Sequence, residues 1–363
     1  MQPSSQDQAS PLFPILSRSS FEAPDPLALS LQIGLMVTSA VSAAVQLHLP
    51  EYLEQPKTVE ELAQETNTHA PSLYLLLRAL AGIGIFTELD EKQHIFGHTD
   101  RSRLLLPEAT ANLVRLWGAD YQWDSWRDLA HTIKTGKPAM TRSYGDDMTL
   151  WSYLDAHPEQ RQEFQEGLAA NARLVIPAIL DAYDFSTVQH FVDIGGGHGA
   201  LAESVLSRYQ QMRATLFDRA QIIEQVQRNK LPKLTPDLTA RYAQAAGSFF
   251  EEIPAGDCYA LKNVLMDWGD EEYLRILRAC QKTLEPSGTL LIIEPVLSDE
   301  TPFTKFFSLQ MAMMMHAARH RNLEEHKALL EKAGFTLSRA IPLGLEQMLL
   351  ECKISRARKD GDL

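Results

Sequence analysis

The chain has 363 residues, enough for two or three domains, and its 45% hydrophobic and 22% charged residues are typical of a folded globular protein. Acidic side chains (47) outnumber basic ones (34), and the formal net charge of -13 argues against a nucleic-acid partner, whose phosphates need basic residues. The three cysteines, Cys258, Cys280 and Cys352, have neither disulfide nor zinc spacing, so we expect a cytoplasmic protein without a metal.

The first 25 residues are rich in Ser and Pro and lack the basic start of a signal peptide, so we expect a loose tail. The next segment, Leu27–Leu49, contains no Asp, Glu, Lys or Arg and is long enough to span a bilayer. Polar residues such as Gln32 and Gln46 interrupt it, and no basic cluster flanks it. We therefore favour a buried helix that faces a partner over a membrane span, and we expect no membrane partner.

A winged-helix pattern follows that segment. Thr58-Val-Glu-Glu61 is a capping box that opens a short helix, and Ser72–Ala81 continues as a second, Leu-rich helix. Ile85–Glu88 and His94–Phe96 then predict a small hairpin. This outline suits either DNA recognition or dimerisation. The second helix carries one basic residue, Arg78, so we favour dimerisation.

Residues 106–185 predict a run of helices that is rich in aromatic side chains. These aromatic residues are Trp117, Tyr121, Trp123, Trp126, Trp151, Tyr153 and Phe164. Such side chains form either an ordinary core or the wall of a pocket for a flat apolar ligand. The Met-rich run over residues 311–315 has the same two interpretations. The candidate substrate-binding residues are Trp117, Tyr121, Trp123, Met315 and His316.

Beyond residue 185, short β-rich runs alternate with helical patterns, which predicts a Rossmann-like, doubly wound parallel sheet. The predicted strands are His190–Ile194, Ala214–Asp218, Leu238–Gln244, Cys258–Asn263 and Thr289–Glu294. A further strand begins at Gly334-Phe335, and Glu346–Ile354 ends the sheet as a hairpin. The fold class is therefore α/β at the C-terminus, preceded by an all-helical or winged-helix dimerisation domain.

The first strand-to-helix junction, Phe191–Gly199, contains four glycines, which let a backbone approach a ligand closely. A nicotinamide fingerprint needs a glycine at position 200, where this chain has Ala200. The second strand ends in Asp218, whose two oxygens suit the hydroxyls of a ribose. Asp193 is acidic and the phosphate-binding Gly-Lys-Ser/Thr motif is absent, so a nucleoside without phosphates fits best.

Five motifs in order resemble those of small-molecule O-methyltransferases of the caffeic-acid and hydroxyindole type. They are Asp193-Ile-Gly-Gly-Gly-His-Gly199, Leu216-Phe-Asp218, Gly247-Ser-Phe-Phe-Glu-Glu-Ile-Pro254, Leu261-Lys-Asn-Val-Leu-Met-Asp-Trp268 and Leu291-Ile-Ile-Glu-Pro295. The resemblance covers about residues 27–354. It implies a homodimeric, S-adenosyl-L-methionine-dependent enzyme that acts on a small molecule of secondary metabolism.

The resemblance also divides the chain: a tail (1–25), a winged-helix dimerisation domain (26–105), a helical linker with the substrate pocket (106–185), a cofactor-binding domain (186–356) and a tail (357–363). It assigns the cofactor to Asp193, Gly195, Gly197, Asp218, Ser248, Phe249 and Lys262. The family usually has Asp in place of Ser248, and a hydroxyl accepts a weaker hydrogen bond from the adenine amine than a carboxylate does.

The resemblance implies a catalytic histidine at a position where this chain has Met266, whose thioether accepts no proton at neutral pH. A family acidic residue is replaced by His320. Glu294, the usual partner of the catalytic histidine, is retained, and so is Asp267.

Two functions remain open for a chain that lacks the catalytic histidine at position 266. Methyl transfer can survive because alignment of the reacting groups supplies ~7–11 kcal/mol, or because His320 or His131 has become the base. Alternatively, the cofactor serves as a fixed positive charge for a pericyclic, hydroxylation or decarboxylation reaction, as in a few members that resemble this family. A DNA-binding regulator is a third class, disfavoured by charge. Formation of S-adenosylhomocysteine separates the first two, because only methyl transfer produces it.

Overall fold

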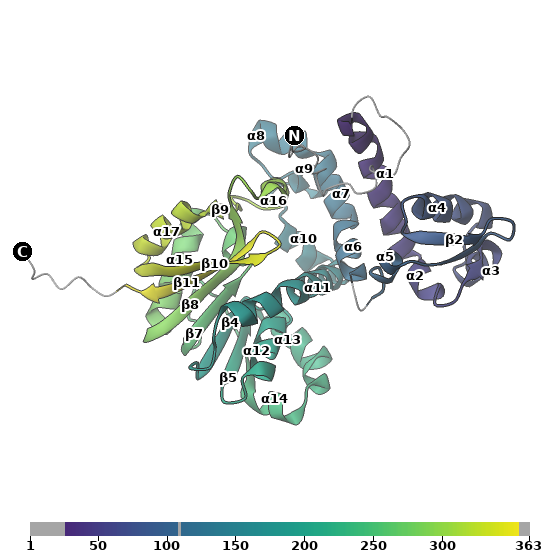
Figure 1. Cartoon of the computed structure of the whole chain (residues 1–363). Helices are drawn as coiled ribbons and strands as arrows, with labels where there is room; N and C mark the ends of the chain where they lie inside the picture. The colour runs from purple at the N-terminus through teal and green to yellow at the C-terminus, as the bar shows by residue number, and fades with distance from the viewer. Residues whose placement is uncertain (1–25, 108–109, 356–363) are drawn as a thin grey trace, which may run out of the picture. The chain divides into compact units, whose positions relative to one another are not determined.

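The computed structural model describes residues 26–107 and 110–355, and the chain divides into two compact units with the boundary between Ala119 and Asp120 (Figure 1). Both predicted tails lie outside the described residues. The domain boundaries that we expect after residues 105 and 185 stay a prediction.

The first unit is a winged helix, as predicted. Its helices are α1 (Pro26–Gln46), α2 (Leu49–Tyr52), α3 (Val59–Glu65), α4 (Ala70–Gly82), α5 (Asp100–Arg103) and α6 (Ala111–Trp117), and its strands are β1 (Lys57–Thr58), β2 (Phe86–Asp90) and β3 (Ile95–His98). The capping box at α3 is confirmed, because the Thr58 hydroxyl accepts the Glu61 N–H at 3.2 Å and the Glu61 carboxylate accepts the Thr58 N–H at 2.8 Å. Leu62, Leu77 and Phe96 form the core of this unit.

The charge-free segment forms α1, which packs against α4 and α6. Its side chains Leu35 and Met36 are 62% and 68% exposed. No helix in the described part of the chain is both long and apolar enough to cross a membrane.

The second unit begins with five helices and continues into an eight-stranded sheet. The helices are α7 (Asp120–Arg127), α8 (Leu129–Thr135), α9 (Met140–Tyr144), α10 (Leu150–Ala156) and α11 (Pro158–Ala182). The strands are β4 (His190–Ile194), β5 (Arg213–Asp218), β6 (Tyr242–Ala246), β7 (Gly256–Lys262), β8 (Leu284–Leu297), β9 (Arg321–Asn322), β10 (Phe335–Gly344) and β11 (Gln347–Ile354).

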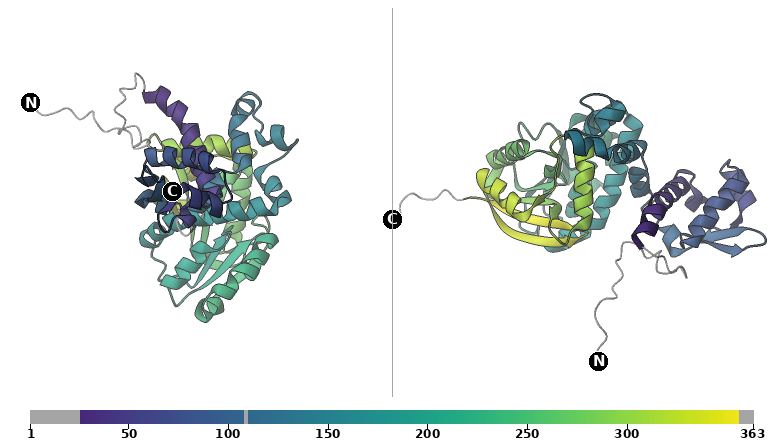
Figure 2. Two further views of the ribbon diagram at one scale, coloured as in Figure 1. Left: turned by 90° about the vertical axis from the view of Figure 1, so that its right-hand side faces the viewer. Right: turned by 90° about the horizontal axis from the view of Figure 1, so that it is seen from above.

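The strand order β10-β11-β8-β7-β4-β5-β6 confirms the doubly wound sheet. Strands β8, β7, β4, β5 and β6 run parallel, while β11 and β10 form the predicted antiparallel hairpin, drawn in yellow in Figure 2. The strand predicted over Leu238–Gln244 was wrong in its first half. There Thr235 caps α14 (Pro236–Arg241) by accepting the Leu238 N–H, and Pro236 at the first turn favours a helix, so β6 starts only at Tyr242.

Successive residues of the central strands point to opposite faces of the sheet. On β4, Phe191 packs with α11, α12 (Ala200–Arg208) and α13 (Ala220–Asn229), whereas Val192 and Ile194 pack with α15 (Asp270–Thr283) and α17 (Leu323–Lys332). Figure 1 shows these two helix layers on either side of the sheet. The carboxyl ends of β4, β5, β7 and β8 therefore meet at one edge, where ligands of open α/β sheets bind.

Candidate active site

The loop after β4 has a backbone that needs glycine. Gly195, Gly197 and Gly199 have φ angles of +67°, +57° and +72°, which residues with a Cβ rarely adopt. Gly196 has no such angle, but a Cβ there would lie 2.5 Å from Cγ of Asp193. Around Gly197 the space for a Cβ is open, so its backbone is accessible to a ligand.

Asp218 ends β5 and bonds to this loop. One carboxylate oxygen accepts the Gly197 N–H at 2.9 Å, and the other accepts the Arg219 N–H at 2.7 Å. Burial raises the pKa of Asp218, while these two N–H groups favour its ionised form. Each oxygen retains a lone pair for a further donor, which fits the two hydroxyls of a ribose.

Asp193 and Lys262 bring opposite charges to the same edge of the sheet. Asp193 is 1% exposed, and one of its oxygens accepts the Ala202 N–H at 3.3 Å. Its other oxygen has no hydrogen-bond partner among the described residues. Burial raises the pKa of Asp193 to about 6, against the opposing effect of Lys262. A buried acceptor without a donor beside a glycine loop fits a polar ligand such as S-adenosyl-L-methionine.

Ser248 and Phe249 lie beside these residues. The Gly247 N–H donates to the backbone carbonyl of Asp218 at 3.0 Å, which places the segment next to the end of β5. The Ser248 hydroxyl accepts the Phe250 N–H at 3.3 Å. The Phe249 ring packs edge-on against Trp268 at 5.8 Å, and its Cε1 atom lies 3.9 Å from where a Cβ on Gly195 would be.

Met266 lies in the short helix η3 (Leu265–Asp267) and is 7% exposed. Its N–H donates to the Glu294 carboxylate at 3.2 Å, and its carbonyl accepts the Arg319 N–H at 3.0 Å. Glu294 is 1% exposed, and burial raises its pKa to about 7. Burial and then the charge of Glu294 raise the pKa of Asp267 well above its usual value, which favours its protonated form.

His320 is 1% exposed, and burial lowers its pKa to about 4, so the ring is neutral. Its Nδ1 atom lies 2.9 Å from the Ser308 hydroxyl, which also donates to the Thr304 carbonyl at 2.9 Å. Because that hydroxyl has one hydrogen, Nδ1 of His320 is the donor to Ser308. Nε2 is then an unprotonated acceptor, and it has no partner in the described part of the chain.

The other predicted residues are distributed over both units. His131 lies half-buried on α8, and its Nε2 atom has no partner among residues 26–107 and 110–355. Trp117 is in the first unit. Tyr121, at 1% exposure, packs on Tyr153 with ring centroids 5.4 Å apart. Trp123 is half-buried, Met315 is 5% exposed and His316 is exposed.

The sequence interpretation missed two buried residues at this site. Arg321, which is 0% exposed, donates to the Leu265 carbonyl at 3.2 Å and the Trp268 carbonyl at 2.8 Å, so it holds η3 from both sides. His326, also 0% exposed, lies on α17. The signal that reveals it is helical spacing: His326 precedes Leu329 and Leu330 by three and four positions, which puts a polar ring on the apolar stripe.

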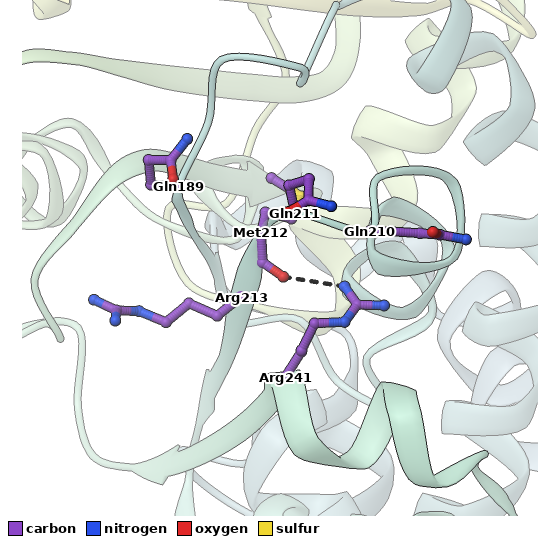
Figure 3. A pocket seen from close by; sticks show the side chains of 6 residues that line it. All are labelled: Gln189, Gln210, Gln211, Met212, Arg213 and Arg241. Atoms are coloured by element: carbon purple, nitrogen blue, oxygen red, sulfur yellow. Dashed lines mark hydrogen bonds between the residues drawn. The ribbon is translucent and has the colours of Figure 1, made fainter.

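Figure 3 shows a separate pocket lined by Gln189, Gln210, Gln211, Met212, Arg213 and Arg241. The Arg241 guanidinium donates to the carbonyls of Met212 at 3.0 Å and Leu206 at 3.2 Å, so it caps the end of α12. Arg213 begins β5, the strand that ends in Asp218. This pocket is therefore at the opposite end of the strand from the glycine loop.

The glycine loop, Asp218 and the sheet with its terminal hairpin define an S-adenosyl-L-methionine-dependent methyltransferase. The chain belongs to the O-methyltransferase family: the family profile of the O-methyltransferase domain matches residues 126–336, and that of the O-methyltransferase dimerisation domain matches residues 29–108.

Its relatives act in secondary metabolism. The phenazine O-methyltransferase PhzM of Lysobacter antibioticus is 33% identical over 90% of this chain and 95% of its own length. The mitomycin biosynthesis 6-O-methyltransferase of Streptomyces lavendulae is 31% identical over 86% of this chain and 89% of its own. A solved structure of NcsB1, an O-methyltransferase of neocarzinostatin biosynthesis, in complex with S-adenosylmethionine and 2-hydroxy-5-methyl naphthoic acid, is 28% identical with a TM-score of 0.72, covering 88% of this chain and 96% of that one.

Proposed function

We propose that the chain methylates a hydroxyl oxygen of an aromatic or polyketide-like secondary metabolite. The cofactor supplies an electrophilic methyl group on a sulfonium. The observation that carries the proposal is the Gly197–Asp218 hydrogen bond at 2.9 Å, which joins the glycine loop to a ribose-type acceptor. The relatives support the substrate class, because phenazine and naphthoic acid are flat aromatic compounds. Asp193, Gly195, Ser248, Phe249 and Lys262 complete the proposed cofactor site.

The substrate proton needs an acceptor other than Met266. A phenol has a pKa of ~10, and each pKa unit of mismatch costs ~1.4 kcal/mol. His320, with its pKa lowered to about 4, is mismatched by about six units, or ~8 kcal/mol. Glu294, with its pKa raised to about 7, is mismatched by about three units, or ~4 kcal/mol, which is no worse than release to water at pH 7.

We therefore assign proton acceptance to Glu294. Its Oε1 atom is buried and accepts no hydrogen bond from the described residues. His320 then has a different role: its unpartnered Nε2 accepts a hydrogen bond from a neutral hydroxyl and orients it. The Nε2 atom of His131 also has no partner among the described residues, so His131 is a second candidate for a polar contact with the substrate. Within the second unit, Tyr121 and Trp123, with Met315 and His316, remain the proposed substrate contacts. The substrate contact predicted for Trp117, which belongs to the first unit, stays a prediction.

The alternative is a reaction in which the cofactor is a fixed positive charge and is not consumed. Met266 favours this alternative, because its buried thioether fills the position of the catalytic base without being able to accept a proton. Under this alternative, product forms without S-adenosylhomocysteine.

The test is to incubate the protein with S-adenosyl-L-methionine and two phenolic probes, a hydroxynaphthoic acid and a hydroxyphenazine. S-adenosylhomocysteine and the methyl ether are both quantified, and naphthoic acid without a hydroxyl is the control. We expect equal amounts of both products and none with the control. Glu294→Gln should lower turnover by about 10²–10⁴. Conversion of a probe without S-adenosylhomocysteine would establish the alternative.

We also propose a homodimer built on the first unit. The match to the dimerisation domain supports it, as does the exposed pair Leu35 and Met36 on α1. No group of three or more metal-ligating side chains lies close enough to bind an ion within the described ranges. We expect turnover to be the same with and without a chelator.

A further inference from the structure

Three buried polar side chains form a row from α15 through α17 to β8. The Tyr273 hydroxyl lies 2.8 Å from Nδ1 of His326, and Nε2 of His326 lies 3.6 Å from Oε1 of Glu294. Tyr273 and His326 are 0% exposed and Glu294 is 1% exposed. The other oxygen of Glu294 accepts the Met266 N–H, so the row ends at the position where the catalytic histidine is missing.

The position of each proton in this row follows from burial. Burial, and then the charge of Glu294, raise the pKa of Tyr273 well above its usual value, so its hydroxyl keeps its hydrogen. Burial and then the charge of Arg321 lower the pKa of His326 to about 4, so its ring carries one hydrogen. The Tyr273 hydroxyl has no acceptor other than Nδ1 of His326 among the described residues, so we assign its hydrogen to this bond. The single ring hydrogen of His326 is then on Nε2 and faces Glu294. A shift of ~0.5 Å closes this gap to a hydrogen bond.

We propose that His326 is a positioning residue for methyl transfer: its Nε2–H, oriented by Tyr273, holds the Glu294 carboxylate ionised and directed at the Met266 turn. This inference rests on the proposed function, in which Glu294 accepts the substrate proton. In the proposed reaction the O–H bond of the substrate and the S–CH3 bond of the cofactor would break as the new O–CH3 bond forms. The proton would pass to Glu294, and the sulfur would leave with its electron pair as the neutral thioether of S-adenosylhomocysteine. The hydrogen on His326 stays in place and stabilises the carboxylate beforehand.

Other charged and titratable groups face Glu294 and His326, and they influence the pKa values of both side chains. Arg321 from β9 favours the ionised form of Glu294 and the neutral form of His326. Asp267 from η3 is coupled to Glu294 by charge. Glu325, His320 and Arg319 also act on His326.

A spectroscopic test needs no substrate. In protein labelled with ¹⁵N-histidine, the signals that vanish in His326→Gln belong to His326. We expect them to report the tautomer with hydrogen on Nε2, and to change in Tyr273→Phe, which lacks the donor to Nδ1. A signal from the opposite tautomer would overturn the inference, because Nε2 would then offer Glu294 no hydrogen.

A kinetic test uses the phenolic probe that is turned over. His326→Phe fills the space without an N–H, and we expect kcat to fall about tenfold or more. The acidic limb of its pH profile should move up by about one unit, since a lost donor raises the pKa of Glu294. KM for the cofactor should stay unchanged. His326→Gln keeps an N–H donor and should recover most of both effects.

Tyr259→Phe is the matched control. Its buried hydroxyl donates to the Pro254 carbonyl at 2.7 Å and lies 3.0 Å from the Thr283 hydroxyl, outside the row. We expect this variant to lose stability with no change in the acidic limb. If Tyr259→Phe moved the limb as His326→Phe does, or if His326→Phe left it in place, His326 would be structural only.

The Glu294→Gln variant separates an error in the proposed function from an error in the role of His326. If Glu294→Gln retained full turnover, Glu294 would not be the proton acceptor, and the role of His326 would fall with it. If Glu294→Gln lost turnover while His326→Phe kept the wild-type pH profile, only the inference about His326 would be wrong.

Discussion

The carboxylate of Asp218 accepts the backbone N–H of Gly197 at 2.9 Å, although the two residues belong to different strand–helix units of the sheet. The bond spans 21 positions in the sequence. It couples the shape of the glycine loop to the same carboxylate that we assign to the ribose. Loss of this side chain therefore affects both the ligand contact and the loop that surrounds it.

Asp218→Ala is expected to weaken S-adenosyl-L-methionine binding by about 1.5–3 kcal/mol, the range for hydrogen bonds to a charged group. Asp218→Asn keeps one acceptor oxygen and should lose less. Isothermal calorimetry measures both. Asp181→Ala, which removes an exposed carboxylate paired with Arg208 at 2.7 Å, is the control and should bind normally. Unchanged affinity in Asp218→Ala would remove Asp218 from the cofactor site.

Met266→His is expected to preserve or raise turnover on a weakly acidic phenol. The new imidazole would lie beside Glu294, whose carboxylate already accepts the N–H of residue 266 at 3.2 Å. A nearby base recovers part of the ~4 kcal/mol that ionising the phenol costs at pH 7. Steady-state kinetics with S-adenosylhomocysteine as readout measures this, and Met266→Leu, which has the same bulk and no base, is the control.

The same Met266→His variant also tests the alternative function. If the site serves a reaction other than methyl transfer, Met266→His should slow that reaction and produce no S-adenosylhomocysteine.

Glu294 should make the protein less stable as the pH rises. Its pKa is about 7 in the folded chain and ~4.3 when unfolded, so the folded state binds more protons between these values. The stability from this group is complete below pH ~4.3 and is lost as the pH rises through about 7. The free energy of unfolding of Glu294→Gln, relative to that of the wild type, should therefore be about 3 kcal/mol higher at pH 8 than at pH 5. Urea unfolding at both pH values tests this; a gain independent of pH would contradict the assignment.

His320 should have the reverse effect. Its pKa is about 4 in the folded chain and ~6.5 when unfolded, so the unfolded state binds more protons between these values. Stability from the neutral ring is complete above pH ~6.5 and is lost as the pH falls through about 4. His320→Gln should resist acid better than wild type, with an unfolding midpoint at lower pH. The exposed His316→Gln is the control and should leave that midpoint in place.

A charge on the exposed face of α1 should weaken self-association. Leu35→Glu and Met36→Glu place a carboxylate on side chains that are 62% and 68% exposed. We expect sedimentation at micromolar concentration to show a dimer for the wild type and more monomer for these variants. Leu345→Glu, at a 64% exposed position in the second unit, should remain dimeric. A wild type that sediments as a stable monomer would contradict the proposal.

Much of the fold was predictable from local signals. Strand β4 was predicted to the residue, because the run His190–Ile194 ends at a glycine cluster that cannot continue a strand. The capping box at Thr58 gave the start of α3 in the same way. Strand β6 was only half predicted, since the apolar residues from Leu238 onward masked the helix start at Thr235-Pro236. In that case the capping signal outweighed the β-rich composition.

The site was only partly predictable. The glycine loop and Asp218 are identified by local motifs, since each motif is continuous in the sequence. Tyr273 and His326 are 53 positions apart, and their hydrogen bond exists only because α15 and α17 pack on the same face of the sheet. No local pattern specifies such a contact. The predicted role of His131 as a base stays untested.

The backbone of Met266 is bonded at both its N–H and its carbonyl, to Glu294 and to Arg319, and neither bond uses the Met266 side chain. The backbone geometry at this position is therefore maintained by neighbours through two bonds that any residue except proline can make. A lineage can exchange the reactive group there by a single substitution without first reshaping the scaffold. Gain and loss of a proton-accepting residue at this point are thus short evolutionary steps, and the same property makes position 266 suitable for directed evolution of new reactions.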